Sequence, residues 1–110
     1  MAIKLIADSG STKTEWCLMN GKSVKTFYTQ GLSPYFLSAE QIEYVINEEL
    51  KVKFKKTEPD EIYFYGSGCS NADNVKLVKK AVQKVFNDAK IFVDHDLMGA
   101  AKSLCGNKKG

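Results

Sequence analysis

The segment 8–15 carries the residues best suited to chemistry. It reads Asp-Ser-Gly-Ser-Thr-Lys-Thr-Glu and follows an apolar run at 3–7. Its small residues can offer backbone N–H groups and hydroxyls to a phosphate, and Asp8 can face a hydrated metal ion. The candidate phosphate-binding residues are Gly10, Ser11, Thr12, Lys13 and Thr14. The segment therefore predicts a phosphate-binding turn that begins at a metal-binding carboxylate.

This turn differs from a P-loop, which reads G-x-x-x-x-G-K-[ST] and opens a helix. Here Thr12 precedes Lys13 where glycine is required, and residues 14–20 look like a second strand. The turn is thus predicted to join two strands of a hairpin. Turns of this composition are also common without any ligand, and Lys13 fits an exposed turn lysine equally well. Other features of the chain are needed to distinguish a phosphate-binding turn from an ordinary hairpin turn.

Composition and charge limit the classes of protein to which the chain can belong. Its 110 residues suffice for one domain, and the 44% hydrophobic content is ordinary for a globular protein. Because no apolar run approaches the ~20 residues needed to cross a bilayer, and no signal-peptide pattern is present, we expect a cytoplasmic protein without membrane contact. All 16 basic residues are lysines and the net charge is only +3. This argues against a nucleic-acid partner.

The three cysteines are Cys17, Cys69 and Cys105, and they are far apart in the sequence. No C-x-x-C motif occurs, and a single histidine does not complete a zinc site. We therefore expect three reduced thiols and no structural metal.

The order of elements predicts the fold class. Residues 3–7, 14–20 and 23–29 read as an antiparallel meander, with Asn20-Gly21 as a two-residue turn. The expected elements after it are a helix from the capping box of Ser38 and Gln41 to about Lys51, a strand at 62–65, a helix from Asn71, a strand at 91–93 and a short helix at 97–105. The later strands are apolar runs typical of burial on both faces. The order β-β-β-α-β-α-β-α predicts one α/β unit with a mixed sheet and helices on its faces.

Three polar loops, at 8–14, 66–70 and 94–99, follow the first, fourth and fifth strands. If these strands run parallel, the loops meet at one edge of the sheet, where open α/β sheets bind ligands. The second loop allows close approach of backbone to a ligand, and the third places Asp96 at a helix N-terminus. Asp96 fits a helix cap, and Asp94 competes with it for any special role. Opposite a phosphate turn, however, Asp96 suits the base that phosphoryl transfer needs.

Four segments in this order resemble the N-terminal half of the actin–hexokinase–Hsp70 ATPase superfamily, which has a ribonuclease H-like core. They are Asp8 to Glu15, Gly31-Leu-Ser33, Gly66-Ser-Gly-Cys-Ser70 and Asp96-Leu-Met-Gly-Ala-Ala101. Within the superfamily, the chain is most similar to the N-acetylglucosamine kinase branch. That branch is grouped with the ATPase activators of benzoyl-CoA reductase and 2-hydroxyacyl-CoA dehydratase.

The resemblance implies a ribonuclease H-like sheet and an ATP-dependent sugar kinase that acts on N-acetylglucosamine or a related amino sugar. ATP and Mg²⁺ would be the cofactors, Asp96 the catalytic base, and Asp8 the residue that positions magnesium through water. The residues implied for substrate binding are Ser33, Gly66, Ser67 and Gly68. The alternatives are an ATPase switch of the activator type and an inactive binding fragment with half a nucleotide site.

The resemblance also implies which part of the superfamily's two-lobed fold residues 1–110 form. They correspond to one N-terminal lobe, and the second phosphate motif and the adenosine pocket of the superfamily lie beyond residue 110. We expect the isolated chain to have negligible kinase activity, because a nucleotide held on one side stays exposed to water. The uncovered face between lobes is expected to favour a homodimer.

Overall fold

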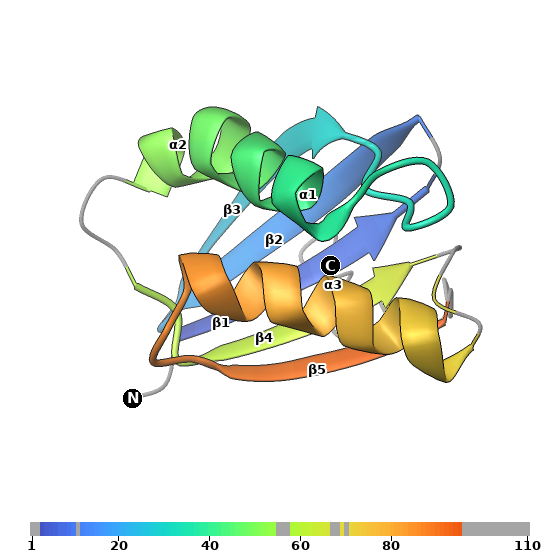
Figure 1. Ribbon diagram of the computed structural model, residues 1–110. Helices are drawn as coiled ribbons and strands as arrows, with labels where there is room; N and C mark the ends of the chain where they lie inside the picture. The colour runs from blue at the N-terminus through green and yellow to red at the C-terminus, as the bar shows by residue number, and fades with distance from the viewer. Residues whose placement is uncertain (1–2, 11, 55–57, 67–68, 70, 96–110) are drawn as a thin grey trace.

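A computed structural model describes residues 3–10, 12–54, 58–66, 69 and 71–95, and shows a five-stranded sheet behind a layer of helices (Figure 1). The strands are β1 (Ile3–Ser9), β2 (Lys13–Asn20), β3 (Ser23–Gln30), β4 (Glu61–Gly66) and β5 (Lys90–His95), in the spatial order β3-β2-β1-β4-β5. β1 pairs antiparallel with β2 and parallel with β4, and β4 pairs parallel with β5. The predicted α/β class with a mixed sheet is therefore confirmed. The helix predicted at 97–105 lies outside the described residues.

The turn between β2 and β3 differs by one residue from the sequence expectation. Asn20 pairs with Ser23, so the two turn residues are Gly21 and Lys22 rather than Asn20 and Gly21. Gly21 has a φ of 64°, the left-handed region that glycine adopts without a steric cost. The register follows from packing, because it directs Trp16 and Phe27 of neighbouring strands toward the helices.

The first helical segment begins as predicted. It consists of α1 (Ala39–Val45), a π-helix η1 (Ile46–Lys51) and α2 (Val52–Phe54). The N–H of Gln41 donates to Ser38 Oγ at 3.2 Å, and the N–H of Ser38 donates to Gln41 Oε1 at 2.9 Å, so the capping box is confirmed. The second helix, α3 (Ala72–Val85), is capped by Asn71, whose side chain accepts from the N–H of Asn74 at 2.8 Å.

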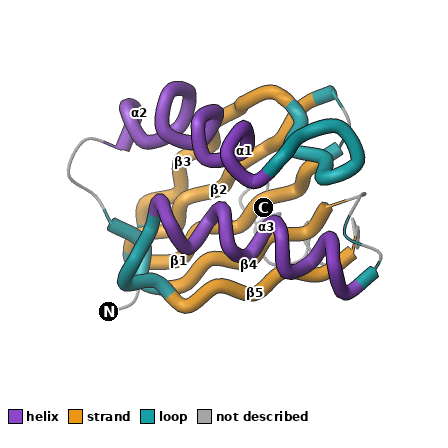
Figure 2. The backbone as a smooth tube through the Cα atoms, in the orientation of Figure 1, coloured by secondary structure: helices purple, strands orange, loops and turns teal. Residues whose placement is uncertain are grey.

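Both helical segments cover the same face of the sheet, as Figure 2 shows. Side chains from every strand and helix fill the space between the two layers. The largest fully buried ones include Trp16, Phe64 and Phe86. Trp16 and Phe64 meet edge to face, with ring centroids 6.0 Å apart.

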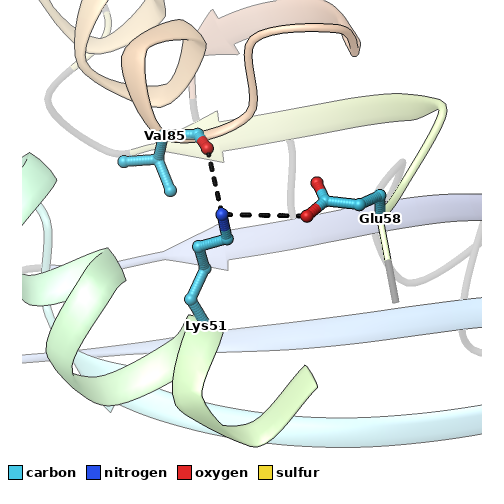
Figure 3. Close-up of polar contacts among 3 residues, drawn as sticks. All are labelled: Lys51, Glu58 and Val85. Carbon is cyan, nitrogen blue, oxygen red and sulfur yellow. Dashed lines mark hydrogen bonds and ion pairs between the residues drawn. The ribbon is translucent and has the colours of Figure 1, made fainter. Parts of the chain in front are cut away.

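Lys51 joins the two parts of the helical layer (Figure 3). Its ammonium donates to the carbonyl oxygen of Val85, 3.4 Å away at the end of α3, and lies 3.8 Å from a carboxylate oxygen of Glu58. It also lies 5.5 Å from the centre of the Phe86 ring. A cation at the C-terminal end of a helix is favourable because the last carbonyl groups carry partial negative charge.

The other face of the sheet is covered less than the sequence predicted. Residues 62–65 and 91–93 were expected to be buried on both faces, but Tyr63 and Tyr65 are half-buried and Phe92 is 48% exposed. The reason is that these three side chains alternate away from the helices. Within the described residues, no helix is long and apolar enough to cross a membrane.

The expectation of three reduced thiols is also wrong. Cys17 is disulfide-bonded, whereas Cys69 is a free and buried thiol. The absence of a C-x-x-C motif did not exclude a disulfide, because cysteines far apart in a sequence can also be bonded when their Cα atoms lie within about 7 Å.

Candidate functional site

The ends of three parallel strands form the edge at which the site was predicted. Asp8 of β1 is in register with Tyr65 of β4, and Tyr65 with Asp94 of β5. The premise that the first, fourth and fifth strands run parallel is thus correct, and Asp8 and Gly66 lie at one edge of the sheet. Ser11, Ser67, Gly68 and Asp96 of the predicted site lie outside the described residues.

The predicted loop after the first strand is shorter than expected. β1 runs on through Asp8 to Ser9, which pairs with Thr14, so only residues 10–12 join the two strands. The N–H of Gly10 donates to the carbonyl oxygen of Lys13 at 2.9 Å and closes the turn. The carbonyl oxygen of Thr12 accepts from the N–H of Gly31 at 3.0 Å. The turn is therefore tied to the segment that follows β3.

A buried chain of hydrogen bonds strengthens this connection. The N–H of Leu32 donates to Ser9 Oγ at 3.1 Å, and Ser9 Oγ lies 2.8 Å from Thr14 Oγ1. Thr14 Oγ1 in turn donates to the carbonyl oxygen of Gln30 at 3.1 Å. Thr14, a candidate phosphate ligand, is fully buried and uses its hydroxyl in this chain. The network fixes the position of the 31–33 segment relative to the turn.

The Gln30 carbonyl oxygen also accepts a hydrogen bond from a second hydroxyl, that of Thr29. Trp16 Nε1 donates to Thr29 Oγ1 at 3.0 Å, and Thr29 Oγ1 donates to the same carbonyl at 3.0 Å. Beyond it, Ser33 is buried, and its hydroxyl accepts from the N–H of Tyr35 at 3.3 Å. Ser33, the predicted sugar-binding residue, thus shapes the turn that follows it.

Asp8 and Lys13 lie on the face of the sheet away from the helices, because strand residues alternate between faces. Lys13 Nζ lies 5.3 Å from the centre of the Tyr28 ring, a cation–π contact. Glu15 pairs with both Asp8 and Tyr28 in the register. Lys13 was predicted as a site residue but Tyr28 was not, because Tyr28 lies on β3, a strand predicted only as scaffold.

Gly66 lies where β4 ends and has no space for a side chain. A Cβ there would be 2.9 Å from Phe64 Cε1 and 3.1 Å from Cys69 Sγ. Its carbonyl oxygen accepts from the N–H of Cys69 at 3.1 Å. Burial, and secondly the charge of Asp94, raise the pKa of the Cys69 thiol to about 11. Cys69 is therefore a packing residue of this turn rather than a nucleophile.

A hollow of about 490 Å³ opens between the end of β3 and the start of α1, and it was not predicted from the sequence. It is lined by Gln30, Leu37, Ser38, Glu40, Gln41, Tyr44 and Val45. Its walls combine amide and carboxylate groups with the aromatic ring of Tyr44. The Tyr44 side chain is 66% exposed, so its ring is accessible from solvent. Residues from the end of β3 and from α1 meet here only in the folded protein.

Within the described part of the chain, no group of three or more His, Cys, Asp or Glu side chains could hold a metal ion. Asp8 fits a more modest role, because Mg²⁺ that arrives with a polyphosphate needs only one or two protein carboxylates.

Comparison with known proteins finds no family model and no curated sequence that matches this chain.

Proposed function

We propose that this chain is the N-terminal lobe of an ATP-dependent kinase that phosphorylates an amino sugar such as N-acetylglucosamine. The observation that carries the proposal is the parallel pairing of β1, β4 and β5, which brings Asp8 to the edge where Gly66 ends β4. This is the edge at which open α/β sheets hold nucleotides. The ribonuclease H-like topology of the complete lobe belongs to the same proposal.

The turn at 10–12 is the proposed contact with ATP phosphates, and Asp8 is the proposed contact with hydrated Mg²⁺. The metal would supply charge neutralisation of the phosphates when it is bound with ATP. Lys13 would add a positive charge beside the turn. Asp96 would accept the proton of the attacking hydroxyl, as the sequence analysis implies.

The 31–33 segment and the neighbouring hollow support a hydroxyl-rich ligand. The hydrogen bonds from Gly31 to Thr12 and from Leu32 to Ser9 couple this segment to the proposed phosphate turn. The hollow offers the amides of Gln30 and Gln41 and the carboxylate of Glu40, which can hydrogen-bond sugar hydroxyls. Phosphoryl transfer requires that a phosphate and an acceptor hydroxyl lie close together.

Nucleotide binding is tested on the chain by titrating Mg-ATP into ¹⁵N-labelled protein and following backbone amide shifts. We expect the largest shifts at Gly10, Thr12 and Lys13, and a weaker response for ATP without magnesium. The turn at Gly21 and Lys22, at the opposite end of β2, is the internal control. Asp8→Asn should abolish the magnesium dependence, while Asp73→Asn, on exposed helix surface, should preserve it.

Sugar phosphorylation is then tested on the polypeptide that includes any sequence encoded after Gly110. Transfer of the γ-phosphoryl group of ATP to an amino sugar supports the kinase. ATP hydrolysis that is indifferent to sugars would instead support the activator type of ATPase. Shifts no larger at the 10–13 turn than at the 20–23 turn would overturn the nucleotide site altogether.

A further inference from the structure

β3 is an edge strand of the sheet, because only β2 pairs with it (Figure 1). The two-residue turn before it is closed by the pair of Asn20 and Ser23, which exchange backbone hydrogen bonds in a hairpin of this kind. Hydrogen-bonded and non-hydrogen-bonded pairs alternate along an antiparallel ladder, so every second residue of β3 directs its N–H and C=O away from β2. These outward residues are Val24, Thr26, Tyr28 and Gln30.

Two hydrogen bonds at the end of β3 agree with this alternation. The carbonyl oxygen of Tyr28 accepts from Lys53 Nζ at 3.5 Å, and the N–H of Gln30 donates to Glu49 Oε1 at 3.0 Å. Both partners belong to η1 and α2. Val24 and Thr26 have no such partner among the described residues. The helical layer therefore covers the last outward groups of β3 and leaves the earlier ones open.

The open stretch also carries exposed apolar side chains. Val24 is 40% exposed and Tyr28 is 51% exposed. Because strand residues alternate between faces and Phe27 packs against the core, Val24, Thr26 and Tyr28 share the face away from the helices. We call these three residues the open edge. An exposed edge of this kind is a template for a further strand.

We propose that the open edge pairs antiparallel with the open edge of a second copy of this chain, around a two-fold axis at Thr26. In this register Val24 of each copy lies opposite Tyr28 of the other, and Thr26 lies opposite Thr26. Pairs of a β-branched with an aromatic residue and pairs of threonines are favourable between strands. The three pairs exchange about six backbone hydrogen bonds. The edge is thus self-complementary, as a two-fold interface requires.

Charge favours a second copy over an unrelated peptide. The same register brings Gln30 opposite Lys22 of the second copy. Since the Glu49 carboxylate is bound at the N–H of Gln30, the Lys22 ammonium of the second copy arrives beside it, and the two-fold axis repeats this contact. Lys25 lies opposite Phe27 of the second copy, so no like charges lie directly opposite each other on the paired strands. Complementary charges of this kind fix the register of an interface.

The pairing should be weak. One strand edge buries little surface, which places the contact at the low end of specific interfaces. Lys53 also competes for the carbonyl oxygen of Tyr28, which the second strand needs. The homodimer expected from the sequence was assigned to the uncovered face between lobes, whereas this contact lies on β3. The inference is independent of the proposed kinase function.

Self-association is tested by sedimentation equilibrium of the full chain over a wide range of concentration, together with ¹⁵N spectra of the same samples. We expect a mass that rises from monomer to dimer, with concentration-dependent amide shifts at Val24, Thr26 and Tyr28. The amides of β5, at the opposite edge of the sheet, are the internal control. A monomer at every concentration, or a dimer whose shifts lie outside β3, would overturn the proposal.

The backbone pairing is tested at Thr26. Thr26→Pro removes an N–H that makes no bond to β2, so the hairpin should persist while the second strand loses a hydrogen bond and meets the proline ring. Thr26→Val keeps the N–H and is the control. We expect dimerisation to be lost in Thr26→Pro and kept in Thr26→Val. Equal association of the two variants, both folded by circular dichroism, would contradict the strand pairing.

The register is tested by exchanging charges. Lys22→Glu places a carboxylate beside Glu49 of the second copy and should weaken the dimer several-fold, whereas Lys80→Glu, on the exposed side of α3, makes the same change in net charge and should not. The double variant Lys22→Glu and Glu49→Lys should recover the affinity. Lys53→Met, which removes the competing donor, should strengthen association. Equal affinities of Lys22→Glu and Lys80→Glu would overturn the register centred on Thr26.

Discussion

The hydroxyls of Ser9 and Thr14 lie 2.8 Å apart in the interior, where β1 and β2 approach their shared turn. Ser9 also accepts from the N–H of Leu32, so one side chain connects the turn to the segment after β3. The same pair of residues thus joins three stretches of chain at the candidate site.

Removal of the Ser9 hydroxyl should be costly. Ser9→Ala leaves the buried N–H of Leu32 without its acceptor, and we expect a loss of about 1–3 kcal/mol in the free energy of unfolding. Urea denaturation measures this loss. Thr12→Ala, at an exposed position of the same turn, is the control and should change stability by less than about 0.5 kcal/mol. Equal effects of the two substitutions would show that the hydrogen-bond chain does not hold the turn.

Two glycines at the candidate edge should respond differently to an added methyl group. Gly66→Ala places Cβ 2.9 Å from the Phe64 ring and 3.1 Å from Cys69 Sγ, and overpacking of this kind costs about 1–3 kcal/mol. Gly10→Ala meets its nearest atom at 3.6 Å, an ordinary contact. Thermal unfolding of both variants should show a clearly lower melting temperature for Gly66→Ala alone. A Gly10→Ala protein as unstable as Gly66→Ala would contradict this account.

The raised pKa of Cys69 predicts both slow reactivity and a dependence of stability on pH. The pKa rises from 9.0 to about 11 on folding, so the thiolate fraction at pH 8 should fall about 100-fold, and iodoacetamide should react correspondingly slowly. Between these two pKa values the unfolded chain loses its proton first. The free energy of unfolding should therefore decrease as pH rises from 9 toward 11.

Urea denaturation at pH 8 and at pH 10.5 measures this decrease, with Cys69→Ala as the control. In Cys69→Ala the free energy of unfolding should decrease less over this pH range than in the wild type, and the difference is the contribution of the thiol. Tyr63 and Tyr65 also have raised pKa values, Tyr63 chiefly through its hydrogen bond to Glu61 and Tyr65 through burial, and they act in the same direction at higher pH. An identical pH dependence in the wild type and in Cys69→Ala would refute the assignment.

Lys51 and Glu58 form an ion pair whose two partners should contribute unequally. Lys51→Met removes the charge at the end of α3 and the hydrogen bond to Val85 while keeping an apolar side chain, and should cost about 1 kcal/mol. Glu58→Gln should cost less than about 0.5 kcal/mol, because the Glu58 side chain is 64% exposed and exposed pairs contribute little. Denaturation in low and high salt measures both. A larger loss for Glu58→Gln would show that the ion pair dominates.

Features that depend on neighbours in the sequence could be predicted. The capping box of Ser38 and Gln41 is an example, because its partners are three residues apart. The strands were also predicted, but their ends were not. Asp8 and Ser9 looked like loop residues, yet pairing with two neighbouring strands extends β1 through both of them.

The candidate site likewise has some features that the sequence predicts and others that depend on the tertiary structure. The sequence by itself determined the order of the elements and the residue types at the ends of the strands, including Asp8 and Gly66, because local spacing and composition encode both. Only the tertiary structure decided that Ser9 joins Thr14 to Leu32, that the turn after β2 falls at Gly21 and Lys22, and that Lys13 meets Tyr28. Each of these depends on strand register, which is set by packing side chains distant in sequence against a common core.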